Sequence, residues 1–169
     1  YIVNDGTAVI TELANGGVDT VKTNEATFTL AANLEALQYT GDADFYGTGN
    51  ASGNLITGGA ANDTLDGAGG SDVLTGLGGD DNYLLRSADD RVVEAADGGY
   101  DLVTVNFASG AYTLAANVES GTLGTTAAAV ALSGNDLNNY LSGNNGANTL
   151  NGGAGNDTLD GGAGADKLA

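Results

Sequence analysis

A carboxylate or amide side chain returns every nine residues in two stretches of this 169-residue chain. The eight nine-residue units begin at Gly49, Gly58, Gly67, Gly76, Gly134, Gly143, Gly152 and Gly161. Position six of a unit is always Asp or Asn: Asn54, Asp63, Asp72, Asp81, Asn139, Asn148, Asp157 and Asp166. Oxygen donors at a fixed spacing suit a hard cation, and calcium takes about 6–8 of them. The pattern therefore predicts cation binding.

Glycines precede these side chains and bring further oxygens into reach. Glycine at positions one, two and four lets the backbone take positive φ and form a tight turn, which aims carbonyl oxygens inward. We expect the position-six side chains to bind metal together with residues at positions one and three: Gly58, Ala60, Gly67, Gly69, Gly76, Gly78, Gly152, Ala154, Gly161 and Ala163. One turn has too few oxygens for calcium, so each site should lie between two stacked turns.

The rest of each unit predicts a short strand that positions the turn. Position eight is always a large apolar residue, which should point into a thin core: Ile56, Leu65, Leu74, Tyr83, Leu141, Leu150, Leu159 and Leu168. Two units make one coil, so a unit should stack on the unit eighteen residues later. The predicted position-six pairs are Asn54–Asp72, Asp63–Asp81, Asn139–Asp157 and Asn148–Asp166. They suggest on the order of four sites, weaker where Asn removes a charge, with Asp63–Asp81 the best candidate.

The sequence contains an internal repeat, which divides it into two modules. "LAANLE" at 30–35 returns as "LAANVE" at 114–119, and "GGVDTV" at 16–21 returns as "GGYDLV" at 98–103. The first module covers 1–82, with a strand-rich spacer at 1–48 and a nine-residue array at 49–82. The second covers 83–169, with a spacer at 83–133 and an array at 134–169. Alternating apolar and polar residues between glycine turns predict short strands in both spacers.

Composition limits the partners and the chemistry. The formal charge is −18, from 4 basic and 22 acidic residues, so nucleic acid and anionic membranes would be repelled. No apolar run approaches the roughly 20 residues of a membrane span. His and Cys are absent, which disfavours zinc and copper and leaves the oxygen-binding cations calcium and magnesium. The same absence removes the Ser–His–Asp triad and thiol nucleophiles, so we expect no enzyme.

The units resemble the RTX, or haemolysin-type, calcium-binding repeat, whose pattern is GGxGxDxUx with U a large apolar residue. GGAGNDTLD at 152–160 matches it at every position, and GGAANDTLD at 58–66 lacks only the glycine at position four. The resemblance implies an all-β fold, a right-handed parallel β-roll or β-solenoid with calcium between successive turns. It further implies export by a type I secretion system and a place outside the cell or on its surface.

Acidic residues outside position six have less specific roles. Glu12 and Glu94 occupy matching places in the two modules, as do Asp19 and Asp101. These four residues either bind extra calcium or are solvated or hydrogen-bonded to loop amides, and we favour the second role. Glu35 and Glu119 favour a turn or cap role over catalysis. Position nine, Asp66 and Asp160, should face solvent.

These observations favour a non-catalytic, calcium-dependent structural module of a secreted or cell-surface repetitive protein, such as an adhesin, surface-layer or fibre component. It should fold on binding calcium after export and should pack end to end against neighbouring modules or identical chains. Four alternatives stay open: the secretion and folding domain of an exported hydrolase such as a lipase or protease, a carbohydrate-binding module, a metal-free β-solenoid with Asn ladders, and a flexible linker.

Overall fold

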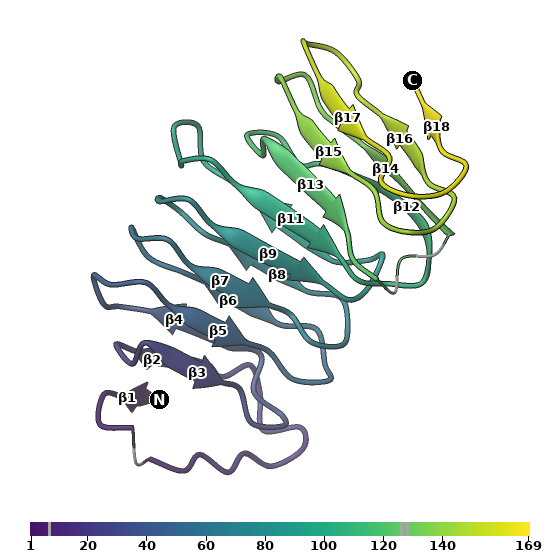
Figure 1. Ribbon diagram of the computed structural model, residues 1–169. Helices are drawn as coiled ribbons and strands as arrows, with labels where there is room; N and C mark the ends of the chain where they lie inside the picture. Colours follow the sequence, from purple (N-terminus) through teal and green to yellow (C-terminus); the bar gives the residue numbers. More distant parts are fainter. Residues whose placement is uncertain (7, 126, 128) are drawn as a thin grey trace.

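Every regular element is a β-strand in the part of the chain that the structure describes, residues 1–6, 8–125, 127 and 129–169 of a computed structural model (Figure 1). One sheet holds, in spatial order, β1 (Ile2–Val3), β2 (Thr20–Thr23), β4 (Ala36–Tyr39), β6 (Leu55–Thr57), β8 (Val73–Thr75) and β10 (Arg91–Val93). A second sheet holds β3 (Thr27–Thr29), β5 (Tyr46–Thr48), β7 (Thr64–Asp66), β9 (Asn82–Leu85), β11 (Leu102–Val105), β13 (Ser120–Leu123), β15 (Tyr140–Ser142) and β17 (Thr158–Asp160). The third holds β12 (Ser109–Thr113), β14 (Ala129–Ser133), β16 (Thr149–Asn151) and β18 (Lys167–Leu168).

All neighbouring strands are parallel, because the chain winds as a coil that visits each face once per turn. In the arrays the register is eighteen residues, as the pairs Ile56↔Leu74 and Leu65↔Tyr83 show. The second array repeats this with Leu141↔Leu159 and Leu150↔Leu168. Over the described residues the coil makes about nine turns, so the predicted β-roll is confirmed.

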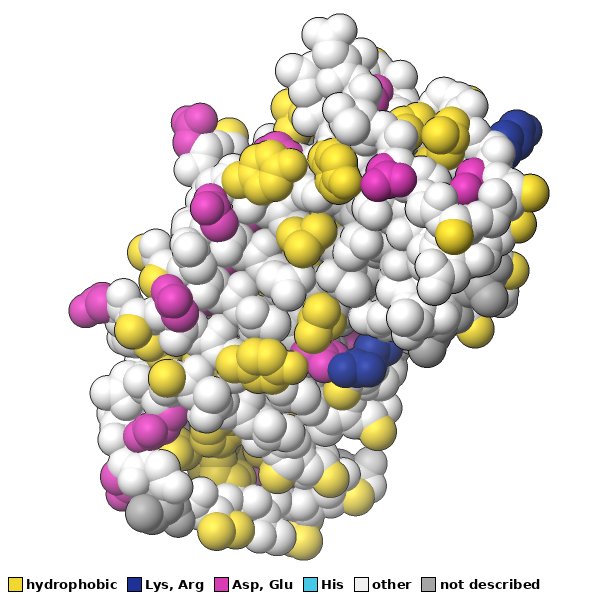
Figure 2. Space-filling view, in the orientation of Figure 1, with side chains coloured by type: hydrophobic (Ala, Val, Ile, Leu, Met, Phe, Trp, Pro, Cys, Tyr) yellow, Lys and Arg dark blue, Asp and Glu magenta, His cyan; other side chains and the backbone are white. Residues whose placement is uncertain are grey.

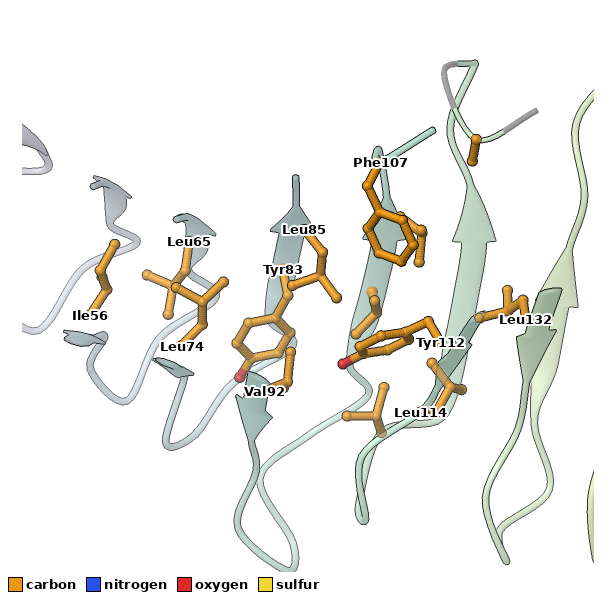
Figure 3. Packing of buried hydrophobic residues seen from close by; sticks show 14 of the residues in the cluster. Ile56, Leu65, Leu74, Tyr83, Leu85, Val92, Phe107, Tyr112, Leu114 and Leu132 are labelled. Carbon is orange, nitrogen blue, oxygen red and sulfur yellow. The ribbon is translucent and has the colours of Figure 1, made fainter. Parts of the chain in front are cut away.

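In the arrays the core is a single ladder of side chains between the two faces, and strands of the spacers, such as β4 and β11, bury two residues each. A three-residue strand points only its middle residue inward, as the burial of β6 and β8 shows. That residue is position eight, and Ile56, Leu65 and Leu74 are fully buried and lie in succession along the coil (Figure 3). Larger rings, including Tyr83, Phe107 and Tyr112, fill the middle of the molecule. Leu168, in β18, is 48% exposed.

The spacers continue the coil of the arrays. The sheet that begins at β3 runs through to β17, and its strand β9 crosses the predicted module boundary at residues 82 and 83. Turns outside the arrays change length: the register is 16 residues for Val21↔Leu37, 19 for Leu37↔Ile56 and 20 for Tyr83↔Val103. The added residues lie in the turns, so the core ladder stays continuous. The module boundaries themselves stay a prediction from the sequence repeat.

The face opposite the eight-stranded sheet is divided between two separate sheets. Its first sheet ends at β10 and its other sheet begins at β12, with no strand pairing between them in the described residues. The Tyr112 hydroxyl makes a hydrogen bond with the backbone of Val92 across this division. No helix in the described part of the chain is long and apolar enough to cross a membrane.

Candidate metal centre

The position-six side chains form a ladder from turn to turn. The backbone N–H of Asn54 donates to Oδ1 of Asp72, and that of Asp63 donates to Oδ1 of Asp81, both at 2.7 Å. In the second array the corresponding bonds from Asn139 to Asp157 and from Asn148 to Asp166 are 2.9 Å long. The structure thus brings together all four predicted position-six pairs. At least one oxygen of each Asp in these pairs accepts a backbone amide, and both oxygens of Asp63 do so, from Phe45 and Gly59.

The second carboxylate oxygen is buried without a partner at two of these residues. Asp72 is 1% exposed and Asp81 is 2% exposed, and Oδ2 of each has no hydrogen bond. A buried, unpaired carboxylate oxygen is costly, and a cation is the partner that would relieve it. Burial raises the pKa of Asp72 to about 6 and that of Asp81 to about 8, and neighbouring carboxylates add to the rise.

The glycine at position one leaves room for converging oxygens. A Cβ added at Gly58 would collide with Oδ2 of Asp63 in its own turn and would lie 3.0 Å from the carbonyl oxygen of Gly76 in the next turn. The same crowding by the position-six side chain occurs at Gly67, Gly76, Gly152 and Gly161. Position one is therefore glycine because of close approach. Our expectation of positive φ there is wrong: positive φ occurs at positions two and four, for example at Gly153 and Gly155.

The asparagines of position six differ from Asp72 and Asp81 in having all their side-chain polar atoms bonded. Oδ1 of Asn54 accepts from the Asn50 amide at 2.7 Å, and its Nδ2 donates to the carbonyl of Leu34 at 2.9 Å. Asn139 makes the same kind of bonds, to the Asn135 amide and the Val118 carbonyl. These side chains therefore have no unpaired oxygen and no charge to offer a cation. This supports weaker binding wherever Asn holds position six.

The donor set suits calcium. It consists of carboxylate oxygens and backbone carbonyls, which calcium accepts in flexible geometry. The position-three residues, Ala60, Gly69, Gly78, Ala154 and Ala163, lie in these turns and are half-buried or exposed. Residues 48–83 and 133–168 match the family model of the RTX calcium-binding nonapeptide repeat, in four copies.

The two arrays are RTX calcium-binding repeats. The resemblance read from the sequence is thereby confirmed, and calcium is the ion that such repeats bind. No match to the chain was found among curated proteins or among solved structures. Which residues hold the ions stays a proposal, and the contacts above support the position-six aspartates first.

Position nine of the RTX units differs between the arrays. Asp160 is exposed, as we expected, but Asp66 is 3% exposed, so the prediction is wrong there. The Arg86 guanidinium donates to both oxygens of Asp66, with a closest distance of 2.6 Å. Burial acts to raise the pKa of Asp66, but the bonds from Arg86 and from the Ala68 amide outweigh it and hold the pKa below its ordinary value. Arg86 comes from the spacer, which follows no nine-residue pattern, so the pattern could not reveal this pair.

The turn-to-turn ladder extends beyond the RTX arrays. Oδ1 of Asp90 accepts from the Asp72 amide at 3.1 Å, and Oδ1 of Asp101 accepts from the Asp81 amide at 2.9 Å. Glu119 and Glu35 accept the amides of Asp101 and Asp19 in the preceding coil turn, so both have a structural contact between turns. Asp101 bonds to a loop amide, as favoured, yet it is fully buried rather than solvated. The recurrence of Asp19 and Asp101 at an offset of 82 residues was the signal for these positions.

Proposed function

We propose that this chain is a non-catalytic, calcium-folded structural module of a secreted or cell-surface repetitive protein. The observation that carries the proposal is the stacking of buried carboxylates at one-turn intervals, with unpaired oxygens at Asp72 and Asp81. Only 4 basic residues accompany 22 acidic ones. Carboxylates extend along the face seen in Figure 2, where basic side chains are few. Without cations these charges repel, and the core of the arrays, one buried side chain per strand, is too thin to compensate.

Calcium outside the cell would set where the module folds. Millimolar calcium is available there, whereas the cytosol holds far less, so the chain would stay unfolded for export and fold afterwards. This agrees with the type I export implied by the RTX family. Each calcium bound between two turns would neutralise carboxylates of both, and folding and binding would be one event.

The open ends of the coil support end-to-end assembly. At one end β1 and β3 pair with a neighbour on one side only, and at the other β17 and β18 do the same. Such edges are templates for another strand. About nine turns at a strand spacing of about 4.8 Å give a coil roughly 40 Å long. Neighbouring modules, or identical chains, would cover these edges and extend the coil into a fibre or stalk.

Small-angle scattering and far-UV circular dichroism test the proposal. In calcium the radius of gyration of a single folded chain should be about 15 Å, and larger where chains assemble end to end, and that of the single chain should rise to about 40 Å after chelation. The far-UV circular dichroism signal of the β-strands should also be lost after chelation. Identical spectra and radii in calcium and in chelator would refute calcium-dependent folding. Turnover of an ester, peptide or glycoside by the calcium-bound chain would refute the non-catalytic role.

A further inference from the structure

Three carboxylates meet where the first RTX array joins the following spacer. Asp81 belongs to the turn before β9, Glu94 follows β10, and Asp101 precedes β11. One oxygen from each lies within 4.8 Å of one from each of the others. The nine-residue pattern includes Asp81 but has no place for Glu94, so the pattern does not specify this cluster.

Two of the three side chains have an unpaired oxygen deep in the protein. Asp81 is 2% exposed and Asp101 is fully buried. Each uses Oδ1 to accept an amide of the preceding turn, and Oδ2 of each is buried without a partner. These two atoms are therefore available to a ligand that enters the cluster.

Glu94 is fixed in place toward them. The buried Tyr83 hydroxyl donates to its Oε1, and the Ala95 amide donates to its Oε2 at 2.9 Å. In the described residues no hydrogen bond or ion pair joins any of the three carboxylates to Lys or Arg. The pKa of Asp81 rises to about 8 and that of Asp101 to about 6, through burial first and then through the mutual repulsion of the acidic groups. The cluster lacks a positive partner.

We propose that Asp81, Glu94 and Asp101 form a calcium site of a second type, which clamps the RTX array to the spacer that follows it. Calcium–oxygen distances are about 2.3–2.6 Å, so oxygens around one ion lie at most about 5 Å apart, and the three oxygens of this cluster meet that limit. Three carboxylates also exceed the charge that the position-six pairs bring together, so this site should fill at the lowest calcium concentration.

Part of this arrangement, without a counterpart of Asp81, recurs at the start of the first module. The Tyr1 hydroxyl donates to Glu12, the Leu13 amide donates to Glu12 at 2.9 Å, and Asp19 has an unpaired buried Oδ2. Tyr1, Glu12 and Asp19 each precede Tyr83, Glu94 and Asp101 by 82 residues. The Tyr–Glu–Asp set is thus repeated once per module, in step with the spacer rather than with the nine-residue unit.

Calcium titration calorimetry of Glu94→Gln tests the site, with Glu25→Gln as a control that removes the same charge from the spacer outside the cluster. Gln keeps the length of the side chain and can still accept from Tyr83. Glu94→Gln should weaken the tightest class of sites about tenfold or more, or remove one ion from it, while Glu25→Gln matches the unchanged protein. Equal titrations of both variants would show that the cluster is neutralised by protons, and the proposal would be overturned. That result would leave calcium binding by the RTX turns intact, whereas a wild-type chain that binds no calcium would refute both proposals.

Crystals of the wild-type chain grown in calcium, and soaked in terbium, give a second test that needs no folded variant. An anomalous peak bounded by Oδ2 of Asp81, Glu94 and Oδ2 of Asp101 supports the site. Peaks in the RTX turns with none at these three carboxylates would overturn it.

Discussion

At the residue scale, Ala68 and Leu77 carry an unusual backbone conformation. They hold position two of their units with φ of 64° and 86°. Gly153 and Gly162, at the same position in the second array, have φ of 92° and 76° without the steric cost of a Cβ. The turn geometry therefore prevails over residue type, and the first array retains strain that the second avoids.

Replacing Ala68 with glycine should relieve this strain, and Ala51→Gly is its matched control. Ala51 is exposed and does not have positive φ. Both changes raise the conformational entropy of the unfolded chain, which destabilises the folded state by about 0.4–1 kcal/mol. Only Ala68→Gly also removes the steric cost of a Cβ in the left-handed region, about 1–2 kcal/mol. Urea unfolding in saturating calcium should find Ala68→Gly about 1–2 kcal/mol more stable than Ala51→Gly. Equal stabilities would mean that Ala68 is unstrained.

Asp72→Asn separates the two roles of position six, which are to accept a backbone amide of the preceding turn and to bind a cation. The amide oxygen can still accept from Asn54, but the charge that a cation needs is gone. We expect the calcium midpoint of folding, followed by circular dichroism, to rise about tenfold. Asp160→Asn, at an exposed position nine, should shift the midpoint less than about twofold. Asp66 is unsuitable as this control because it is buried against Arg86. Matching midpoints for Asp72→Asn and Asp160→Asn would show that Asp72 is not a ligand.

At the scale of the strand and turn, the sequence predicts the arrays well and the spacers poorly. The fixed nine-residue interval between Leu65, Leu74 and Tyr83 gives the eighteen-residue register directly, and with it the position-six pairs. Turns of 16, 19 and 20 residues have no such interval, so no count of positions leads from Asp81 to Glu94. The Arg86–Asp66 pair and the Glu94 cluster depend on contacts between array and spacer, which a local pattern does not contain.

The loss of stability on truncating a core side chain should depend on where that residue lies in the coil. Leu74 is fully buried between two turns, so Leu74→Ala should cost about 2–5 kcal/mol. Leu168, at the same position of the last unit, is 48% exposed, and Leu168→Ala should cost less than about 1 kcal/mol. Denaturant unfolding in calcium measures both. Similar losses would mean that the last turn packs as tightly as the middle ones.

At the scale of the whole molecule, the balance of acidic charge makes folding depend on protons as well as on calcium. Burial raises the pKa of Asp81 most, and the charges of Asp63, Asp101 and Glu94 raise it further. A raised folded pKa means that the folded chain binds more protons than the unfolded one between about pH 4 and the folded value. Stability without calcium should therefore fall as pH rises through this range.

The calcium-free chain should accordingly be more stable at pH 4.5 than at pH 8. The loss should run to about pH 6 for Asp72 and Asp101 and to about pH 8 for Asp81. With calcium the trend should reverse, since the ion binds the ionised form. Circular dichroism of the calcium-stripped chain across this range measures the fraction that is folded at each pH, and Asp81→Asn should flatten the upper part of that curve. A slope of the opposite sign would contradict buried, protonated carboxyls.

The direction of the strand hydrogen bonds has a mechanical consequence. In a parallel coil these bonds, and any ions between turns, lie along the long axis. A pull on the two termini therefore loads one turn at a time, and the coil peels instead of shearing as a block. The register from Leu65 to Tyr83 is 18 residues, so each array turn that detaches releases about 60 Å of chain. A stalk built of such coils would lengthen in equal steps under tension, with the force of each step set by the surrounding calcium.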